Sequence, residues 1–226
     1  MEPTGKPFQM KVQDVQVGEP AQEGYLPVTL VTSRGTISYR YYEAPGARCG
    51  AIWVGGVGGG WDTPSRSLYF RLCHELLDAS IASLRVRLRH PTILGEAILD
   101  VLAGINFLRS RGLDTIALTG WSFGGAVALQ AAAISQFVRT VVTLSTQGYG
   151  VDPIARLGPR CSVLLIHGTG DQVLPQVCSE HAYQLAQEPK RLLLYEGANH
   201  ALDEVSEEVH LVVHDWIVEQ LHAATA

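Results

Sequence analysis

Apolar residues follow two alternating patterns along the chain. Short runs rich in Val, Ile, Leu and Thr have the length and composition of β-strands at residues 27–32, 36–42, 51–54, 82–88, 115–119, 140–145, 162–167 and 191–195. Elsewhere, apolar residues recur every three or four positions, which predicts helices over residues 65–79, 94–111, 124–135, 176–187 and 204–222. The stretch Ser33-Arg34-Gly35 predicts a hairpin between the first two strands, whereas helices separate the later ones. The pattern therefore predicts an α/β fold in which an antiparallel entry leads into a parallel, helix-flanked sheet of eight strands.

Composition supports one domain. The chain has 226 residues, of which 46% are hydrophobic, enough for one sizeable core and too few for two. Residues 1–24 are polar and contain Pro and Gly, so we expect a loose lead-in before a single domain over residues 25–226.

Charge and hydropathy exclude several classes of partner. The net charge is −5 and no block of like charges occurs, so nothing indicates a nucleic acid or membrane partner. No run approaches the length of a membrane span, and residues 1–7 lack the apolar segment of a signal peptide. We expect a soluble, cytoplasmic protein, and the sequence indicates no oligomeric state.

Cysteine and histidine spacing gives no sign of a metal or other cofactor. The four cysteines are far apart and form no C-x-x-C pair, which favours reduced, packed thiols: Cys49, Cys73, Cys161 and Cys178. His210 and His214 are four residues apart on a predicted helix, but no Glu follows His210 as a metallopeptidase motif requires.

The stretch Gly120-Trp121-Ser122-Phe123-Gly124-Gly125 carries the chemistry. It follows a β-type run and opens an alanine-rich helix pattern, which is the context of a nucleophile elbow. A serine on such a sharp turn needs nearly side-chain-free residues two before and two after it, and Gly120 and Gly124 meet that need. The sequence therefore predicts Ser122 as a nucleophile.

Two later strands each end in a loop with one polar candidate. Asp171 follows the strand-like run at 162–167, and His200 follows the run at 191–195. Ser122, Asp171 and His200 stand in the chain order expected of a nucleophile, an orienting carboxylate and a general base at successive strand ends of one sheet. Asp152, after the sixth strand, is the alternative acid, and Asp203 is expected at the cap of the last helix.

With these three motifs in register with the strands, the chain resembles the α/β-hydrolases, of the small, lidless serine-esterase, dienelactone-hydrolase-like kind. The resemblance covers residue 25 to the end of the sequence. Larger relatives insert a helical lid between the sixth and seventh strands, where only residues 146–160 stand here. An open site favours short or exposed acyl groups in a small-molecule substrate.

The resemblance also implies an oxyanion hole. One donor is the backbone N–H of Phe123, and the second comes from the glycine-rich loop after the third strand, with Val57 the best placement and Gly56 the next. This chain has Gly55-Gly56 where the family commonly has His-Gly. A dinucleotide-binding loop is disfavoured, because Trp61 stands where the third glycine of G-x-G-x-x-G belongs.

Aromatic residues near these loops are candidates for the substrate pocket. Trp61, Trp121 and Tyr149 could line it or belong to the core. Arg89 could meet an anionic substrate, although a structural, ion-paired role is the favoured interpretation.

Two classes of function remain. The first is a serine hydrolase of esters, thioesters or lactones, in which peptidase and perhydrolase chemistry share the triad. The second is a hydrolase-fold binding or signalling module with an idle site, against which the complete Ser-Asp-His set argues. Dehalogenase chemistry is disfavoured because it needs a carboxylate where Ser122 stands.

Overall fold

The computed structural model describes residues 9–225. These residues contain one sheet of nine strands. Their spatial order is β1-β2-β3-β5-β4-β6-β7-β8-β9, and their bounds are β1 Val12–Val17, β2 Leu26–Thr32, β3 Gly35–Tyr42, β4 Cys49–Val54, β5 Ile81–Arg87, β6 Thr115–Trp121, β7 Val138–Leu144, β8 Ser162–Gly168 and β9 Lys190–Tyr195. The first three strands run antiparallel, β3 joins β5 antiparallel, and all pairs from β5 to β9 are parallel. The predicted antiparallel entry and parallel body are confirmed, as is the hairpin at residues 33–35.

Strand β1 corrects the prediction of eight strands. It lies in the segment expected to be a loose lead-in, and the part of that segment formed by residues 1–8 lies outside the described residues. Every residue of β1 is exposed, and the strand is held by its backbone pairing with β2. An edge strand without a buried face has no apolar alternation, so the sequence pattern could not reveal it.

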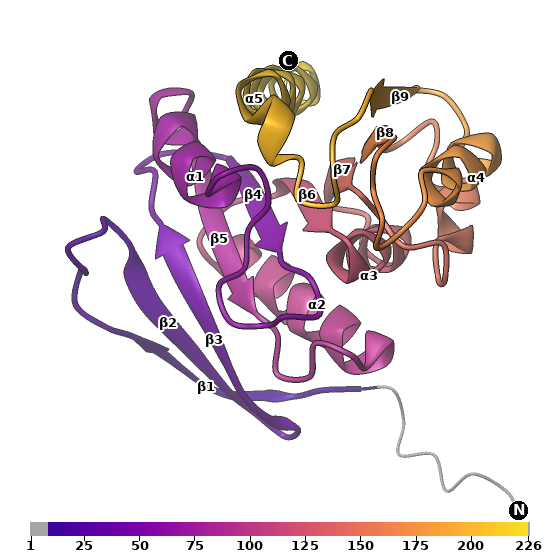
Figure 1. Cartoon of the computed structure of the whole chain (residues 1–226). Coiled ribbons are helices and arrows are strands. Elements are labelled where there is room, and N and C mark those ends of the chain that lie inside the picture. Colours follow the sequence, from indigo (N-terminus) through magenta and orange to yellow (C-terminus); the bar gives the residue numbers. More distant parts are fainter. Residues whose placement is uncertain (1–8, 226) are drawn as a thin grey trace, which may run out of the picture.

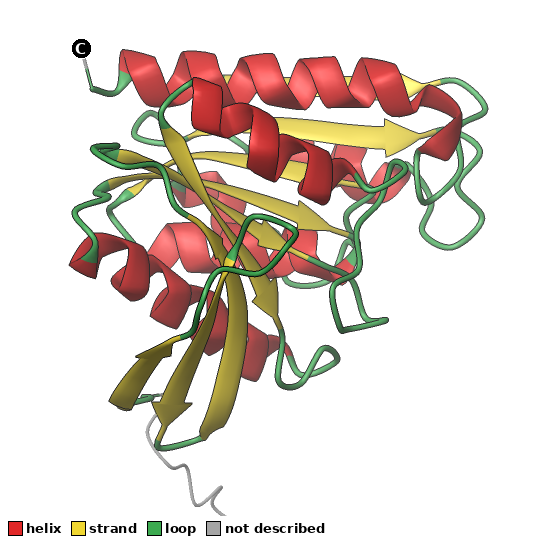
Figure 2. Cartoon of the chain, turned by 90° about the vertical axis from the view of Figure 1, so that its left-hand side faces the viewer, coloured by secondary structure: helices red, strands yellow, loops and turns green. Residues whose placement is uncertain are grey.

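Five helices cover the two faces of the sheet, as Figures 1 and 2 show: α1 Leu68–Asp78, α2 Leu94–Ser110, α3 Phe123–Ile134, α4 Val177–Leu185 and α5 Ser206–Ala223. Helices α1 and α5 pack on one face, and α2, α3 and α4 pack on the other. The buried stripe of α5 consists of Val209, Val213, Ile217 and Leu221, spaced four residues apart. In the central strands nearly every residue is buried, as expected of a parallel sheet covered on both sides.

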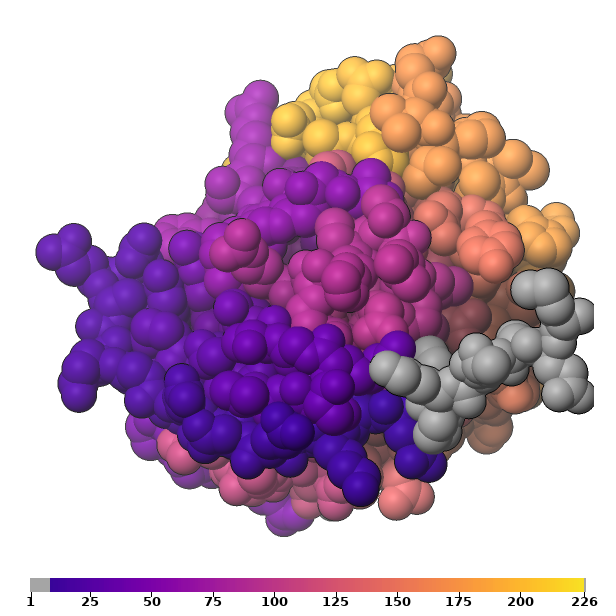
Figure 3. All heavy atoms as spheres, turned by 90° about the horizontal axis from the view of Figure 1, so that it is seen from below, coloured from indigo at the N-terminus to yellow at the C-terminus, as the bar shows by residue number. Residues whose placement is uncertain are grey.

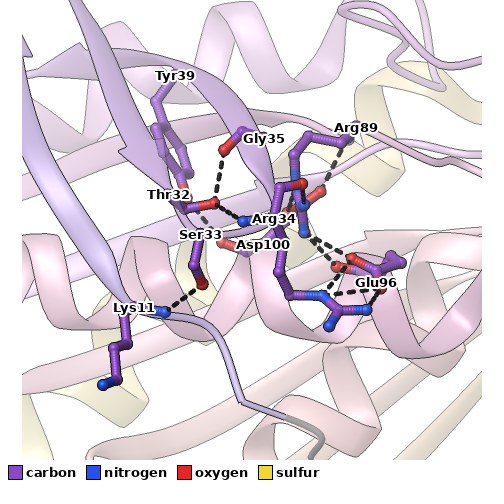
Figure 4. Close-up of polar contacts among 9 residues, drawn as sticks. All are labelled: Lys11, Thr32, Ser33, Arg34, Gly35, Tyr39, Arg89, Glu96 and Asp100. Atoms are coloured by element: carbon purple, nitrogen blue, oxygen red, sulfur yellow. Dashed lines mark hydrogen bonds and ion pairs between the residues drawn. The ribbon is translucent and has the colours of Figure 1, made fainter. Parts of the chain in front are cut away.

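A buried cluster of charges joins the N-terminal hairpin to α2 (Figure 4). Arg89 donates to Asp100 and Glu96, with Nε 2.6 Å from Asp100 Oδ1 and Nη2 3.0 Å from Glu96 Oε2. Arg34, in the β2–β3 turn, pairs with the same Glu96. The Tyr39 hydroxyl donates to the Asp100 carbonyl at 2.8 Å. Seen from below, the N-terminal strands in indigo accordingly lie against the magenta surface of the α2 region (Figure 3).

The chain reverses direction across the sheet between β4 and β6. From β4 it passes to β5 on one side, and from there to β6 on the other side of β4. In open α/β sheets, ligands bind at the carboxyl ends of the strands at such a switch point. Between β7 and β8 the structure has only the 3-10 helix η1, Asp152–Arg156, so the predicted lack of a lid domain is confirmed. Among the described residues, none of the helices combines the length and apolar character that crossing a bilayer requires.

Candidate active site

Ser122 occupies the turn between β6 and α3, at the switch point. Its backbone angles are φ 57° and ψ −119°, a conformation that residues with a side chain rarely adopt. A Cβ on Gly120 would collide with the Gly124 carbonyl, and a Cβ on Gly124 would lie 2.5 Å from the Gly55 carbonyl oxygen. The predicted need for glycine on both sides of Ser122 is therefore confirmed.

The loop after β4 lies against Ser122. A Cβ on Gly56 would be 3.5 Å from the Ser122 Cβ, an ordinary van der Waals distance, so this part of the loop is adjacent to the serine. Within residues 9–225, neither the N–H of Phe123 nor that of Val57 donates to a protein acceptor. Val57 is 55% exposed. Both N–H groups therefore lack a protein acceptor among these residues, and the oxyanion role that the resemblance implies for them stays a prediction.

The loops after β8 and β9 pack on each other and bring Asp171 to His200. The N–H of Gly170 donates to the Ala198 carbonyl at 3.0 Å, and a Cβ on Gly168 would collide with that same carbonyl. The result is a hydrogen bond of 2.7 Å between His200 Nδ1 and Asp171 Oδ2.

The surroundings of Asp171 keep it ionised. Its side chain is buried, and its Oδ1 accepts the N–H groups of Val173 at 2.8 Å and Leu174 at 2.9 Å. Burial alone would raise the pKa of Asp171, but the donors from Leu174, His200 and Val173 outweigh it and hold the pKa below its ordinary value. A carboxylate only accepts, so His200 Nδ1 carries the proton and the Nε2 lone pair is free to act as a base.

Trp121 connects the serine turn to His200. Its Nε1 donates to the His200 carbonyl at 3.0 Å, and the two ring centres are 5.3 Å apart. Among the hydrogen bonds of residues 9–225, none joins Ser122 Oγ to His200; bonds of this type commonly tighten only when substrate binds. The structure thus pairs Asp171 with His200 directly and places Ser122 next to the tryptophan that supports His200.

A strained turn that the sequence did not reveal braces the His200 loop. Ser65, Arg66 and Ser67 have φ values of 53°, 49° and 68°. The N–H of Ser65 donates to the Ala201 carbonyl at 2.7 Å, and that of Arg66 to Asp203 Oδ1 at 2.9 Å. The sequence predicts that the helix starts at residue 65, but α1 starts at Leu68. The prediction is wrong because no glycine marks the turn at residues 65–67. Asp203, expected to cap the last helix, accepts from this turn instead.

The other candidates lie in different surroundings. Tyr149 is 79% exposed on the loop after β7, and Asp152 is exposed in η1. The Trp61 ring lies 4.5 Å from the Arg40 guanidinium, and its carbonyl accepts from Arg85. Arg89 belongs to the buried charge cluster, as the structural interpretation has it. Substrate contacts by Trp61, Trp121 and Tyr149 remain predictions.

Neither metal-type clusters nor disulfides occur in the part of the chain that the structure describes. No group of three or more His, Cys, Asp or Glu side chains is placed there so that it could hold a metal ion. His210 binds Glu75 of α1, with 2.5 Å between Nε2 and Oε2, and His214 binds its neighbour Asp215. The four cysteines are free, and three of them are buried.

A family model and a curated relative match this chain. The model of the dienelactone hydrolase family matches residues 66–224. The uncharacterized protein YfhR of Escherichia coli O157:H7 is 33% identical in a match that covers 45% of this chain and 44% of that protein. The matched region thus spans less than half the length of this curated relative.

Solved structures share the fold. A dienelactone hydrolase from Anabaena variabilis has a TM-score of 0.74 at 20% identity, covering 87% of this chain and 98% of that one. Est1E from Butyrivibrio proteoclasticus has a TM-score of 0.69 at 18% identity, covering 83% and 95% of the two chains. At these identities the likeness establishes an α/β-hydrolase fold.

Proposed function

The chain belongs to the dienelactone hydrolase family, and on that premise we propose that it hydrolyses carboxylic esters, thioesters or lactones of small acyl compounds. In this proposal Ser122 is the nucleophile, His200 the general base and Asp171 the acid that orients His200. The observation that carries it is the 2.7 Å hydrogen bond between Asp171 and His200, next to a serine on a strained strand-to-helix turn.

The first half-reaction forms an acyl-enzyme. His200 Nε2 takes the hydroxyl proton as Ser122 Oγ attacks the carbonyl carbon, and the carbonyl oxygen becomes an oxyanion. The free N–H groups of Phe123 and Val57 stabilise that charge, each by roughly 3–4 kcal/mol. The carbon–oxygen or carbon–sulfur bond then breaks, and the leaving group takes the proton from His200.

The second half-reaction releases the acid. His200 removes a proton from water, the resulting hydroxide attacks the acyl carbon, and Ser122 Oγ leaves with that proton. The Asp171 carboxylate stabilises the His200 imidazolium in both halves. The absence of a lid domain between β7 and β8 favours short or exposed acyl groups.

The test combines a probe with a substrate screen. A fluorophosphonate should label Ser122, as read by mass spectrometry, and His200→Ala should abolish labelling. Short-chain p-nitrophenyl esters, acyl-CoA thioesters and lactones are compared as substrates. Ser122→Ala and Asp171→Asn should each lower kcat/KM by about four orders of magnitude.

Asp152→Asn is the matched control, because Asp152 is exposed and Asp171 already occupies His200 Nδ1. It should leave kcat/KM unchanged. Full turnover by folded Ser122→Ala would contradict the assignment of the nucleophile. If Asp152→Asn lost turnover and Asp171→Asn kept it, the assignment of the acid would be contradicted.

A further inference from the structure

A second histidine contacts the acid of the proposed triad. His167, near the end of β8, is fully buried. Its Nε2 lies 3.0 Å from the Leu174 carbonyl oxygen and 3.2 Å from Asp171 Oδ2, and its Nδ1 lies 2.7 Å from Ser179 Oγ. Both ring nitrogens are therefore engaged, and one of them faces the oxygen that His200 uses.

The partners of His167 determine where its proton lies. The Leu174 carbonyl and the Asp171 carboxylate only accept, so the proton is on Nε2. Burial lowers the pKa of His167, which favours the neutral ring. The Nδ1 atom then accepts the hydroxyl proton of Ser179, which is itself fully buried.

Asp171 consequently has donors on both oxygens. Its Oδ1 receives two backbone N–H groups, and its Oδ2 receives His200 Nδ1 at 2.7 Å and faces His167 Nε2 at 3.2 Å. We infer that His167 is a positioning residue, which holds the Asp171 oxygen that orients His200. The catalytic meaning of this inference rests on the proposed function. The hydrogen bond from Ser179 holds the His167 ring in its orientation.

Removing His167 has a direct electrostatic consequence. The Nε2–H of His167 donates to the Leu174 carbonyl and lies 3.2 Å from Asp171 Oδ2. Without the partial positive charge of this N–H, more of the negative charge on Asp171 Oδ2 acts on His200, so the imidazolium of His200 is stabilised. The two acidic groups that follow His200 along the chain are engaged elsewhere. Glu204 accepts from the backbone and side chain of Asn199, and Asp203 accepts from Arg66. His167, Asp171 and His200 are thus the titratable groups that face one another.

The test compares His167→Leu, which removes the N–H beside Asp171 Oδ2, with His167→Gln, whose amide N–H replaces it. NMR titration of the His200 ring follows its pKa whether or not the protein turns over, and kcat/KM against pH follows the same ionisation in catalysis. In His167→Leu we expect both midpoints to rise by about half a pH unit or more. In His167→Gln we expect both to return to the wild-type values.

Thermal unfolding establishes that each variant is folded. If His167→Leu does not fold, Ser179→Ala, which frees the His167 ring from its anchor, takes its place and should shift the midpoints in the same direction. An unchanged or lowered His200 midpoint in a folded variant would overturn the inference. Failure of the proposed function gives a different result, because turnover would then not depend on Ser122. The NMR titration of His200 would still report the effect of His167.

Discussion

Arg89 is the cation at the centre of the buried charge cluster, and replacing it tests how much that cluster stabilises the fold. Its side chain is 5% exposed, and the Asp100 side chain beside it is 0% exposed. Arg89→Met keeps much of the apolar stem but leaves the Asp100 carboxylate buried without its cation. Breaking a buried pair in this way costs about 3–5 kcal/mol of unfolding free energy. For a chain of this size that lowers Tm by roughly 6–20 °C.

The chain offers a matched control in Arg48. It pairs with Asp114 at 3.0 Å, but the two side chains are 71% and 47% exposed. An exposed pair contributes about 0–1 kcal/mol, so Arg48→Met should shift Tm by at most about 4 °C. The difference between the two variants therefore measures burial rather than the presence of an arginine–aspartate pair.

The sign of the pH dependence sharpens the prediction. Burial already raises the pKa of Asp100 against the opposing contribution of Arg89, so loss of Arg89 raises it further. A folded-state pKa above the unfolded value means that stability is present at low pH and is lost as pH rises through the folded pKa. The deficit of Arg89→Met should be smallest near pH 4 and grow toward pH 8 in thermal unfolding followed by circular dichroism. A deficit equal to that of Arg48→Met, or one that is constant with pH, would refute the reasoning.

Three further outcomes follow from single residues. Gly120→Ala should prevent folding or lower Tm by more than 10 °C, roughly, since its Cβ meets the Gly124 carbonyl; Gly18→Ala, with only ordinary contacts at 3.5 Å, should leave Tm unchanged in the same scan. Ser122→Gly should unfold at a higher temperature than Ser122→Ala, because glycine relieves strain of about 1–3 kcal/mol; the reverse order in calorimetry would argue against strain. Stability should fall as pH drops below about 6.5, because the pKa of buried His167 is lowered and the unfolded chain takes up the proton first. Between pH 8 and pH 5, the urea midpoint of His167→Gln should decline less than that of the wild-type protein. An equal decline would exclude His167 as the cause of the pH dependence.

The sequence predicted the body of the fold because its signals are local. Runs such as residues 162–167 are apolar throughout, which is what a strand buried on both faces requires. It missed β1 because an exposed edge strand depends on pairing with β2 rather than on its own side chains. The turn at residues 65–67 escaped for a related reason, since its left-handed backbone carries Ser and Arg where glycine would have marked it.

For the site, chain order predicted which residues to examine but not what they contact. Asp171 and His200 could be chosen because each follows a strand. The contact of Trp121 with His200, and that of His167 with Asp171, join residues 79 and 4 positions apart through the packing of loops. Neighbourhood along the chain suggested a substrate pocket for Trp121, which stays a prediction, but it gave no sign of the hydrogen bond from the Trp121 indole to the His200 carbonyl.

The brace at residues 65–67 ties this segment to residues 201–203, which are made much later. During synthesis the Ser122 turn and its flanking glycines emerge long before residues 201–203, on which the brace depends. In a nascent chain on the ribosome, Ser122 would therefore be exposed before it is reactive. His200 would reach its position only after β9 and α5 had packed against the rest of the fold. The point during translation at which a fluorophosphonate first labels Ser122 would show when the sheet is complete.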